Sequence, residues 1–373
     1  MRIVVAPDSF KECLSGPEAG RSISDGIAAY IPAAQIDILP MADGGEGTVE
    51  ALVYATNGKI VEVEAEDPFG KMIMSGYGVL GDNQTVIIEM AKAAGLQVIS
   101  QREPMTASTY GVGELMKHAL SDGYRKIIIG LGGSATNDGG QGMLQALGGK
   151  FFDNNGNPVP LGGGYLNKIS NVDLNGIIPE VYQSEIIIAS DVKNQLCGKD
   201  GATHVFGPQK GVPENRLAEI DQGLSHFADL IENETGKKIR NVPGSGAAGG
   251  LGFGLLALNA EIQSGATIVA EAMKLDEYIK QADWVITGEG KSDFQTAYGK
   301  VPVHVANIAK EYGVKSILIS GALGTNYQQL YPYFTSCHSI ANRPMSLEHS
   351  MENAKQLLYE ASYNVARLIQ LVK

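Results

Sequence analysis

Residues 126–140, KIIIGLGGSATNDGG, place an apolar run directly before a loop that is rich in glycine and short polar side chains. The run is typical of a buried strand, and the next residues, QGMLQALGG, repeat apolar side chains at helical spacing. A strand, a glycine-rich turn and a helix in succession indicate an α/β protein. Glycines let backbone N–H groups approach a ligand, and the first turn of a helix offers unpaired donors with partial positive charge. The loop therefore predicts a binding site for an anion.

The same alternation of strand and helix recurs at both ends of the chain. Strand patterns at RIVVAP, IDILP, DWVIT, SILIS and SCHSI are each followed by a helical pattern, including one near 16–31 and a long one from about Ser346. Residues 59–90 differ, because closely spaced strand patterns broken by turns are typical of an antiparallel meander. We therefore expect a doubly wound parallel sheet built from residues 1–65 and 267–373. Residues 66–266 are expected to form an inserted α/β domain with a mixed sheet.

Composition sets limits on the function. Of 373 residues, 44% are hydrophobic and 19% charged, which excludes a disordered or fibrous chain. The net charge of −12 argues against nucleic acid and against an anionic membrane as partners. Three scattered cysteines predict neither disulfides nor a zinc cluster and favour the cytoplasm. The N-terminal apolar run is too short for a signal peptide, and the glycine-rich segment 241–260 is expected to be a buried loop and helix. Nothing in the sequence predicts an oligomeric state.

Two loops near the N-terminus carry acidic side chains just past strand patterns. APDSFKECLS places Asp8, Ser9 and Lys11 together, although an ordinary turn that ends with Ser15 as a helix N-cap would also explain it. Open α/β sheets bind ligands beyond the carboxyl ends of their strands, so this position favours a functional role.

The second of these loops, ADGGEGT, holds Asp43, Gly44, Gly45 and Glu46. The alternative is that Asp43 is an N-cap and Glu46 its capping-box partner. That alternative explains two residues but leaves the glycines without a reason.

Two further loops offer groups that could hold an anion. In the loop of residues 130–140, Ser134, Thr136, Asn137 and Asp138 could be simple turn formers and caps, but the glycines exceed what a tight turn needs. After the strand pattern EIIIAS, a long glycine-rich basic loop begins at Asp191 and extends to Lys210, and it is a candidate substrate clamp.

The segment TGEGKSDFQTAYGKVP surrounds two glycines with Glu289, Lys291, Asp293 and Lys300. Phosphoryl transfer depends on positioning and on neutralisation of charge by cations and backbone donors. Carboxylates suit Mg²⁺, which binds one or two of them and keeps its waters. The alternative is a solvated surface turn.

The glycine-rich stretch GSGAAGGLG is a weak indicator of a dinucleotide-binding site. GSGAAGGLG matches the dinucleotide fingerprint at Gly244, Gly246 and Gly249 and raises the alternative of a nicotinamide dehydrogenase. No strand pattern precedes it, and no strand with a terminal acid follows about 20 residues on. The missing strand and the missing acid therefore count against a dehydrogenase.

Together these stretches closely resemble the bacterial glycerate kinase family of type I, in the family's order and over nearly the whole chain. The resemblance implies an ATP- and Mg²⁺-dependent kinase of the small molecule D-glycerate, with 2-phosphoglycerate favoured as product. It also implies two α/β domains, one of them flavodoxin-like, around a central cleft. The chain departs from the family pattern at Gln195 (usually proline), at Lys291-Ser292 (commonly Arg-Ile) and at His304 (usually glycine).

On this basis we assign expected roles. The catalytic residues are expected to be Asp8, Lys11, Asp191 and Asp293, with Asp8 or Asp191 accepting the hydroxyl proton. Asp293, with Asp43 or Glu289, is expected to hold Mg²⁺. The expected substrate- and phosphate-binding residues are Ser9, Gly44, Gly45, Gly132, Gly133, Ser134, Thr136, Asn137, Asp138, Lys210, Gly246, Gly249 and Lys300. A kinase of another small hydroxy acid and a non-catalytic organic-acid-binding protein remain alternatives.

Overall fold

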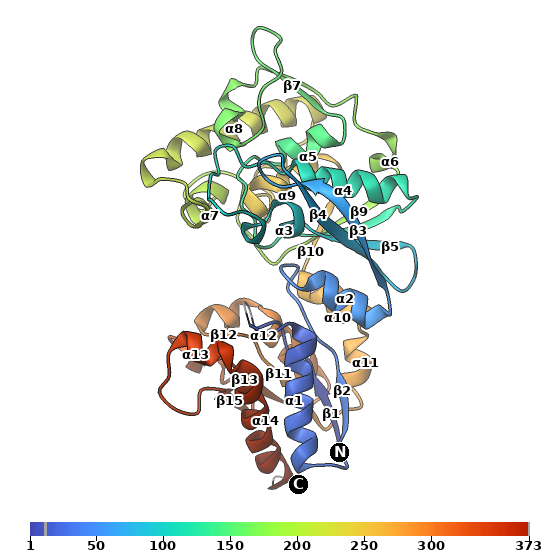
Figure 1. The fold of residues 1–373 in the computed structure, drawn as a ribbon, viewed down its shortest axis with the longest axis vertical. Coiled ribbons are helices and arrows are strands. Elements are labelled where there is room, and N and C mark those ends of the chain that lie inside the picture. Colours follow the sequence, from blue (N-terminus) through green and yellow to red (C-terminus); the bar gives the residue numbers. More distant parts are fainter. Residues whose placement is uncertain (11–12, 372–373) are drawn as a thin grey trace. The chain divides into compact units, whose positions relative to one another are not determined.

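The computed structural model describes residues 1–10 and 13–371, and this part of the chain divides into two compact units (Figure 1). Unit 1 comprises the described residues within Met1–Asp43, Glu50–Ala55 and the chain from Ala266 onward. Unit 2 comprises Gly44–Val49 and Thr56–Gly265. Helix α2 (Thr48–Thr56) contributes residues to both units.

Unit 1 is built on a five-stranded sheet in the order β15-β13-β11-β1-β2, with every neighbouring pair parallel. Counted along the chain, this is the flavodoxin-like order 2-1-3-4-5, which confirms the expected doubly wound sheet from both chain ends. The elements of unit 1 are β1 (Arg2–Val5), α1 (Gly16–Tyr30), β2 (Gln35–Ile38), α11 (Leu275–Ile279), β11 (Trp284–Thr287), β12 (Lys291–Ser292), η4 (Phe294–Tyr298), α12 (Val301–Glu311), β13 (Lys315–Ser320), β14 (Ala322–Leu323), η5 (Tyr327–Leu330), β15 (Ser336–Ser339), α13 (Leu347–Glu352) and α14 (Ala354–Leu371). Helix α10 (Gly265–Ala272) begins at the boundary between the units.

Helices cover both faces of this sheet because its three inner strands, β1, β11 and β13, bury apolar side chains on both sides. Within β13, Ile317 and Ile319 pack in the core with α1 and α14, whereas Leu318 packs with α12 residues on the other side. Figure 1 shows α1 and α14 side by side, and the rings of Tyr30 and Tyr363 meet edge to face between them. Strands that are buried on both faces of a sheet have almost continuous apolar sequences. The inner strands of this sheet could therefore be recognised in the sequence.

Unit 2 is built on a six-stranded mixed sheet in the order β10-β9-β6-β5-β4-β3. Strands β5, β6, β9 and β10 are parallel, and β3 and β4 extend the sheet as an antiparallel meander. The elements are β3 (Lys59–Glu66), β4 (Met72–Val79), β5 (Thr85–Glu89), α3 (Ala91–Ala94), η1 (Leu96–Val98), α4 (Tyr110–Ser121), β6 (Lys126–Gly130), α5 (Gln141–Ala146), β7 (Lys150–Phe152), η2 (Gly163–Lys168), β8 (Asn171–Asp173), α6 (Pro179–Tyr182), β9 (Glu185–Ala189), α7 (Ala202–Lys210), η3 (Glu214–Arg216), α8 (Leu217–Thr235), α9 (Ala247–Ala257) and β10 (Glu261–Gln263). The mixed α/β architecture expected for the inserted segment is confirmed.

The structure differs from the sequence analysis in two places. Residues 44–49 and 56–65, which were expected in the first domain, lie in unit 2. Strand β3 pairs along its whole length with β4, and the backbone N–H of Val49 donates to Glu89 at the end of β5. The C-terminal helical pattern forms two helices rather than one, since the chain leaves helical geometry at Asn353 between α13 and α14. The segment 241–260 is a buried loop leading into α9, as expected.

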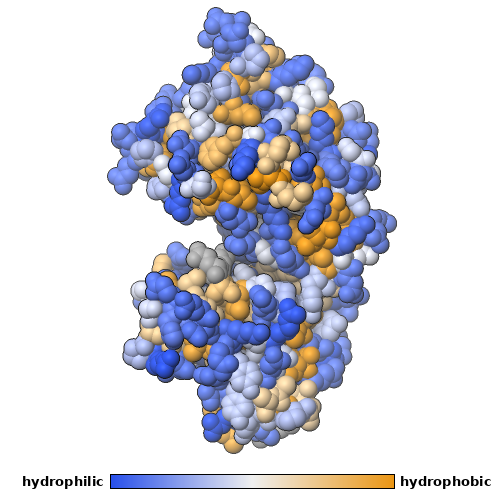
Figure 2. Space-filling model, viewed as in Figure 1, coloured by the Kyte–Doolittle hydropathy of each residue, from blue (hydrophilic) through white to orange (hydrophobic). Residues whose placement is uncertain are grey.

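None of the described helices is both long enough and apolar enough to cross a membrane. On the face seen in Figure 2, hydrophilic side chains cover much of each unit, with groups of apolar side chains between them.

Candidate active site

A cavity of about 460 Å³ lies in unit 1 beyond the carboxyl ends of the parallel strands. Its lining includes residues that follow each of the five strands: Asp8 after β1, Asp43 after β2, Glu289 after β11, Gly321 after β13 and Ile340 after β15. The strand order reverses between β1 and β11, which is where ligands bind in doubly wound sheets. The cavity therefore occupies the position that the fold favours for a ligand.

The loop after β1 is held against the loop after β11. The backbone N–H of Asp8 donates to Gly288 O at 2.8 Å, and Thr287 Oγ1 donates to Ala6 O at 2.7 Å. The Asp8 carboxylate is only 6% exposed and accepts from the backbone N–H of Ser9 at 2.7 Å. Ser15 caps α1 in a capping box with Glu18, so the simple N-cap interpretation of this loop also holds. Lys11 lies outside the described residues.

Glu289 is the centre of a buried hydrogen-bond network. Its Oε1 accepts from Ser292 Oγ at 2.9 Å and from Thr296 Oγ1 at 2.7 Å. Ser292 Oγ also lies 2.7 Å from Ser320 Oγ, at the end of β13. Glu289 Oε2 faces Lys300 Nζ at 3.5 Å. Hydrogen bonds from hydroxyl groups to a buried carboxylate are strong, because the acceptor is charged. This network therefore fixes the loop after β11.

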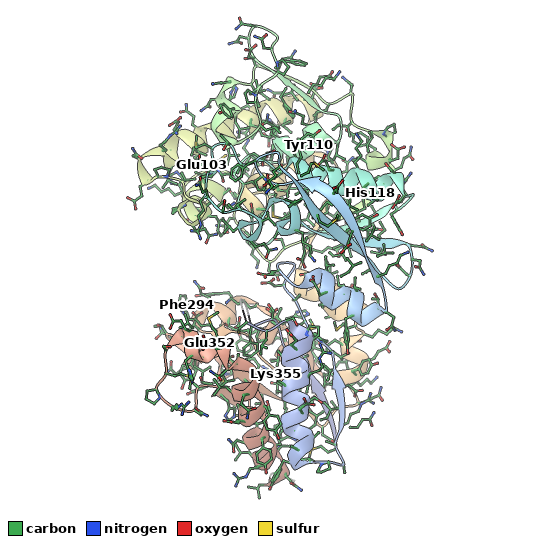
Figure 3. The ribbon with its side chains drawn as sticks, in the orientation of Figure 1. Glu103, Tyr110, His118, Phe294, Glu352 and Lys355 are labelled. Atoms are coloured by element: carbon green, nitrogen blue, oxygen red, sulfur yellow. The ribbon has the colours of Figure 1, made fainter. Side chains whose placement is uncertain are left out.

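Asp293 and Lys291 stand beside this network. Asp293 Oδ1 caps η4 by accepting from the backbone N–H of Gln295 at 2.9 Å, and its Oδ2 lies 3.7 Å from Lys291 Nζ. Lys291 is 66% exposed, so this ion pair contributes little to stability and its cation remains accessible. In Figure 3, Phe294, the neighbour of Asp293 in the sequence, marks the element that Asp293 caps.

Asp8, Asp43, Glu289 and Asp293 all line this one cavity. No group of three or more Asp, Glu, His or Cys side chains among the described residues is arranged to hold a metal ion. Mg²⁺ does not require such a cage, because it binds one or two carboxylates and completes its shell with water and substrate phosphates. The residues present therefore fit a magnesium ion that arrives with a phosphorylated substrate.

In unit 2, the loop after β6 lies over a buried lysine. Lys210, at the end of α7, is 2% exposed, and its Nζ donates to Thr136 O at 2.6 Å and to Ser134 Oγ at 3.3 Å. Burial lowers the pKa of Lys210 to about 7, although the negative charge of Asp138 acts in the opposite direction. In its protonated form, Lys210 makes the glycine-rich loop above it locally positive.

The rest of this loop is fixed by buried polar contacts. Asp138 Oδ2 accepts from Thr109 Oγ1 at 2.8 Å and from two backbone N–H groups, and Oδ1 accepts from a third. Burial nevertheless raises the pKa of Asp138. Asn137 Nδ2 donates to Thr203 Oγ1 at 2.8 Å. Gly132 and Gly133 are the loop residues that reach solvent. The buried contacts of Asp138 and Asn137 thus hold the inner part of the loop in place, whereas Gly132 and Gly133 remain accessible to a ligand.

The other glycine-rich stretches pack tightly around the same loop. A Cβ at Gly249 would collide with Thr136 O, and φ of Gly249 is +67°. Gly246 donates its N–H to Asn194 O at 3.0 Å and leaves no room for a side chain against Gln195. These contacts account for Gly246 and Gly249 by packing, and their phosphate-binding role stays a prediction. The loop enters α9 from α8 without a strand, so it is not a dinucleotide fingerprint.

The ADGGEGT loop lies against the carboxyl ends of the strands of unit 2. Gly44 has φ of +88°, and a Cβ there would meet Ala189 O at the end of β9, while Gly45 lies against Gly132. Helix α2 begins only at Thr48, so Asp43 is not its N-cap. Asp191 is exposed just past the end of β9.

Sequence reasoning missed two groups of residues. Glu89, 2% exposed at the end of β5, accepts from the backbone N–H of Val49 at 2.7 Å, and its place directly after a strand pattern was an available signal. The apolar part of the cavity lining includes Phe10, Ile340, Leu347 and Met351. No sequence signal distinguishes these four from ordinary core residues.

Comparisons with known proteins cover the whole chain. A family model described as the Glycerate kinase family matches residues 3–370. The chain is 45% identical to the glycerate kinase of Halalkalibacterium halodurans over 98% of its own length and 97% of that protein. It is 42% identical to the glycerate 2-kinase of Escherichia coli over 100% of its own length and 98% of that protein. A solved structure from Salmonella typhimurium, described as a candidate glycerate kinase 2, is 42% identical and superposes with a TM-score of 0.87 over 100% of this chain and 98% of that one.

Proposed function

Because the chain belongs to the glycerate kinase family, we propose that it transfers the γ-phosphoryl group of ATP to D-glycerate and releases 2-phosphoglycerate. Family membership makes the chain a kinase, which removes the alternative of a non-catalytic organic-acid-binding protein. The position of transfer is supported by the name of the Escherichia coli relative, a glycerate 2-kinase at 42% identity.

The observation that carries the proposal is the shared cavity of unit 1, lined by Asp8, Asp43, Glu289 and Asp293 together with Lys291 and Lys300. Phosphoryl transfer is catalysed mainly by positioning and by stabilising charge on the phosphoryl oxygens. Asp8, fixed between the loops after β1 and β11, accepts the proton of the glycerate hydroxyl in this proposal, with Asp191 of unit 2 as the second candidate. The lysines balance the charge of the incoming phosphates.

Among the acids of the cavity, Asp293 and Asp43 are the better candidates to hold Mg²⁺. Glu289 is less suited, because its Oε1 already accepts two hydroxyl bonds and its Oε2 faces Lys300. When bound, Mg²⁺ would neutralise phosphate oxygens and favour in-line transfer. Glu289 then acts by keeping the loop between Gly288 and Asp293 rigid.

In the proposal, the loop Gly132–Asp138 of unit 2 holds the carboxylate of glycerate. Its backbone N–H groups suit a small anion, and the negative charge of a bound anion would favour the protonated form of Lys210 below the loop. The proposal requires that both sets of residues act on one ternary complex. Catalysis by convergent loops from separate strands is common in α/β enzymes.

The proposed setting is the cytoplasm, with two small molecules as partners. In the described part of the chain, no disulfide involves Cys13, Cys197 or Cys337, which suits a reducing compartment. The absence of nucleic-acid partners remains a prediction from the net charge of −12.

The test is direct assay with D-glycerate, ATP and Mg²⁺, followed by ³¹P NMR of the product. Phosphorus bound at the 2-hydroxyl couples to a single proton and gives a doublet, whereas phosphorus at the 3-hydroxyl couples to a methylene pair and gives a triplet. A doublet supports the proposal. A triplet contradicts the proposed product, and turnover only with another hydroxy acid contradicts the proposed substrate.

A further inference from the structure

The loop after β6 presents three consecutive backbone N–H groups, which we call the N–H nest. The N–H groups of Gly132, Gly133 and Ser134 donate to no acceptor in the described part of the chain. Those of Leu131 and Ala135, on either side, donate to backbone carbonyls. Gly133 is exposed and has φ of +66°. Successive N–H groups around a left-handed residue form a concavity that binds anions, so the nest is suited to a carboxylate.

Lys210 lies beneath the N–H nest and has neutral hydrogen-bond partners. Its side chain is 2% exposed, and its Nζ donates to Thr136 O at 2.6 Å and to Ser134 Oγ at 3.3 Å. Among the described residues, no carboxylate oxygen lies within 4.0 Å of Nζ. A neutral amine has two N–H groups, which match these two acceptors, whereas an ammonium group has three. The contacts therefore suit the uncharged form of Lys210.

Asp138, in the same loop, is the acid whose charge acts on this amine. Its two oxygens already accept from Thr109 Oγ1 and from three backbone N–H groups. Arg102 and Glu103 (Figure 3), on the loop that leads into α4, are both exposed, and Arg102 donates to Gln209 O. The loops around Lys210 thus bring one carboxylate to bear on it, and that carboxylate is occupied by its own donors.

Helices α8 and α9 pack against α7 without bringing a charge onto Lys210. Helix α9 carries no titratable side chain. On α8, Asp221 interacts with His204 of α7, and Glu219 pairs with Arg216. Burial therefore dominates and lowers the pKa of Lys210 to about 7. At pH 8, about nine-tenths of the free protein carries the neutral amine.

We propose that binding of the substrate carboxylate to the N–H nest is coupled to uptake of one proton by Lys210. The inference deepens the proposed function and rests on it for the identity of the substrate. A carboxylate on the nest places negative charge above Nζ, which favours the ammonium form. The proton passes from the buffer to Nζ, and no covalent bond forms or breaks in the substrate. Lys210 is a positioning residue in this step, because it contacts Ser134 and Thr136 of the loop.

The coupling has a consequence for affinity. Because the anion favours protonated Lys210, protonation of Lys210 favours the anion to the same extent. Above pH 7 the free protein has to take up the proton in order to bind, so the dissociation constant for glycerate should rise about tenfold between pH 7 and pH 9. Below pH 7, Lys210 already carries the proton and the dependence should disappear.

The test is calorimetric titration of the whole protein with D-glycerate alone at pH 6 and pH 8. Each titration is made in two buffers of different ionisation enthalpy, neither of them phosphate, because the difference in heat gives the number of protons exchanged. We expect uptake of about half to one proton per glycerate at pH 8 and about one-tenth or less at pH 6.

Two variants show which group takes up the proton. Lys210→Met should bind glycerate more weakly and exchange no proton at either pH. Lys117→Met is the matched control, because Lys117 is an exposed lysine on α4 of the same unit, and it should take up as many protons as the wild type. Uptake that persists in Lys210→Met overturns the inference, since another group such as Asp138 then receives the proton.

The wild type alone also decides the inference. A wild type that takes up no proton at pH 8, whether glycerate binds without exchange or fails to bind, overturns it. The titration contains no ATP, so uptake at pH 8 that is lost in Lys210→Met supports the inference even if no phosphoryl group is transferred. Turnover of glycerate in the separate assay supports the proposed function whichever way the titration falls.

Discussion

Replacing Lys210 by methionine tests whether the protein keeps a costly buried charge beneath the loop of residues 132–138. Burial lowers the pKa of Lys210 from its ordinary 10.5 to about 7, a difference that corresponds to roughly 5 kcal/mol between the two protonation states. Between these two values the unfolded chain binds the proton that the folded chain has released, so stability rises with pH across this range. Below pH 7 Lys210 is protonated in the folded and the unfolded chain, so burial of its charge lowers the free energy of unfolding by the full amount of roughly 5 kcal/mol.

Methionine keeps the length of the side chain and removes both the charge and the hydrogen bonds. The loss of the donor to Thr136 O costs about 1–3 kcal/mol, because that carbonyl is left buried without it. Removing the charge gains roughly 5 kcal/mol and losing the hydrogen bond costs about 1–3 kcal/mol. At pH 6 we therefore expect the free energy of unfolding of Lys210→Met to be about 2–4 kcal/mol larger than that of the wild type. At pH 10 the order reverses, because the wild-type lysine is then neutral.

The assay is urea unfolding at both pH values, followed by circular dichroism. The chain contains a single tryptophan, Trp284 in β11 of unit 1, so its fluorescence serves as an internal control that should not change. Activity with glycerate should fall in the same variant. A Lys210→Met protein that is less stable than wild type by the same amount at pH 6 and pH 10 would refute the reasoning.

Three further predictions concern single features. Glu289→Ala should lower the free energy of unfolding of unit 1 by about 3–5 kcal/mol, seen in the Trp284 transition, because Ser292 and Thr296 lose a charged acceptor; an unchanged transition would contradict this. Gly249→Ala should lower the melting temperature and weaken glycerate binding in calorimetry, because its Cβ would collide with Thr136 O and the residue has a positive φ. A variant with the melting temperature and the affinity of the wild type would contradict this prediction. Removal of divalent cations by EDTA should abolish turnover and added Mg²⁺ should restore it, whereas turnover that persists in EDTA contradicts a magnesium role for Asp293.

The sequence predicts the parallel sheets well because their strands are buried on both faces. Runs such as IIIG and WVI are apolar and buried, and each is followed by polar residues at the edge where a ligand would bind. That rule placed Asp8 and Glu289 correctly at the ends of β1 and β11 of one sheet.

Three-dimensional contacts decide what the sequence leaves open. Lys210 lies in a glycine-rich basic stretch that resembles an exposed clamp, and only the tertiary packing of α7 against the loop after β6 buries its ammonium group. Gly249 matches a ligand-binding pattern but is required by contact with Thr136, a neighbour far away in sequence. Leu347 follows an ordinary helical pattern, and only the structure shows that it is exposed in the lining of the unit 1 cavity.

The central claim is that the acids at the carboxyl edge of the unit 1 sheet carry out phosphoryl transfer to glycerate. The most direct measurement is kcat at saturating ATP and glycerate for Asp8→Asn and Asp293→Asn, beside Asp276→Asn, which changes an exposed acid on α11 of the same unit. We predict a fall of about 100-fold or more for both cavity variants, with Trp284 fluorescence unchanged and the control at wild-type rate. Cavity variants that turn over glycerate as fast as the control would contradict the claim.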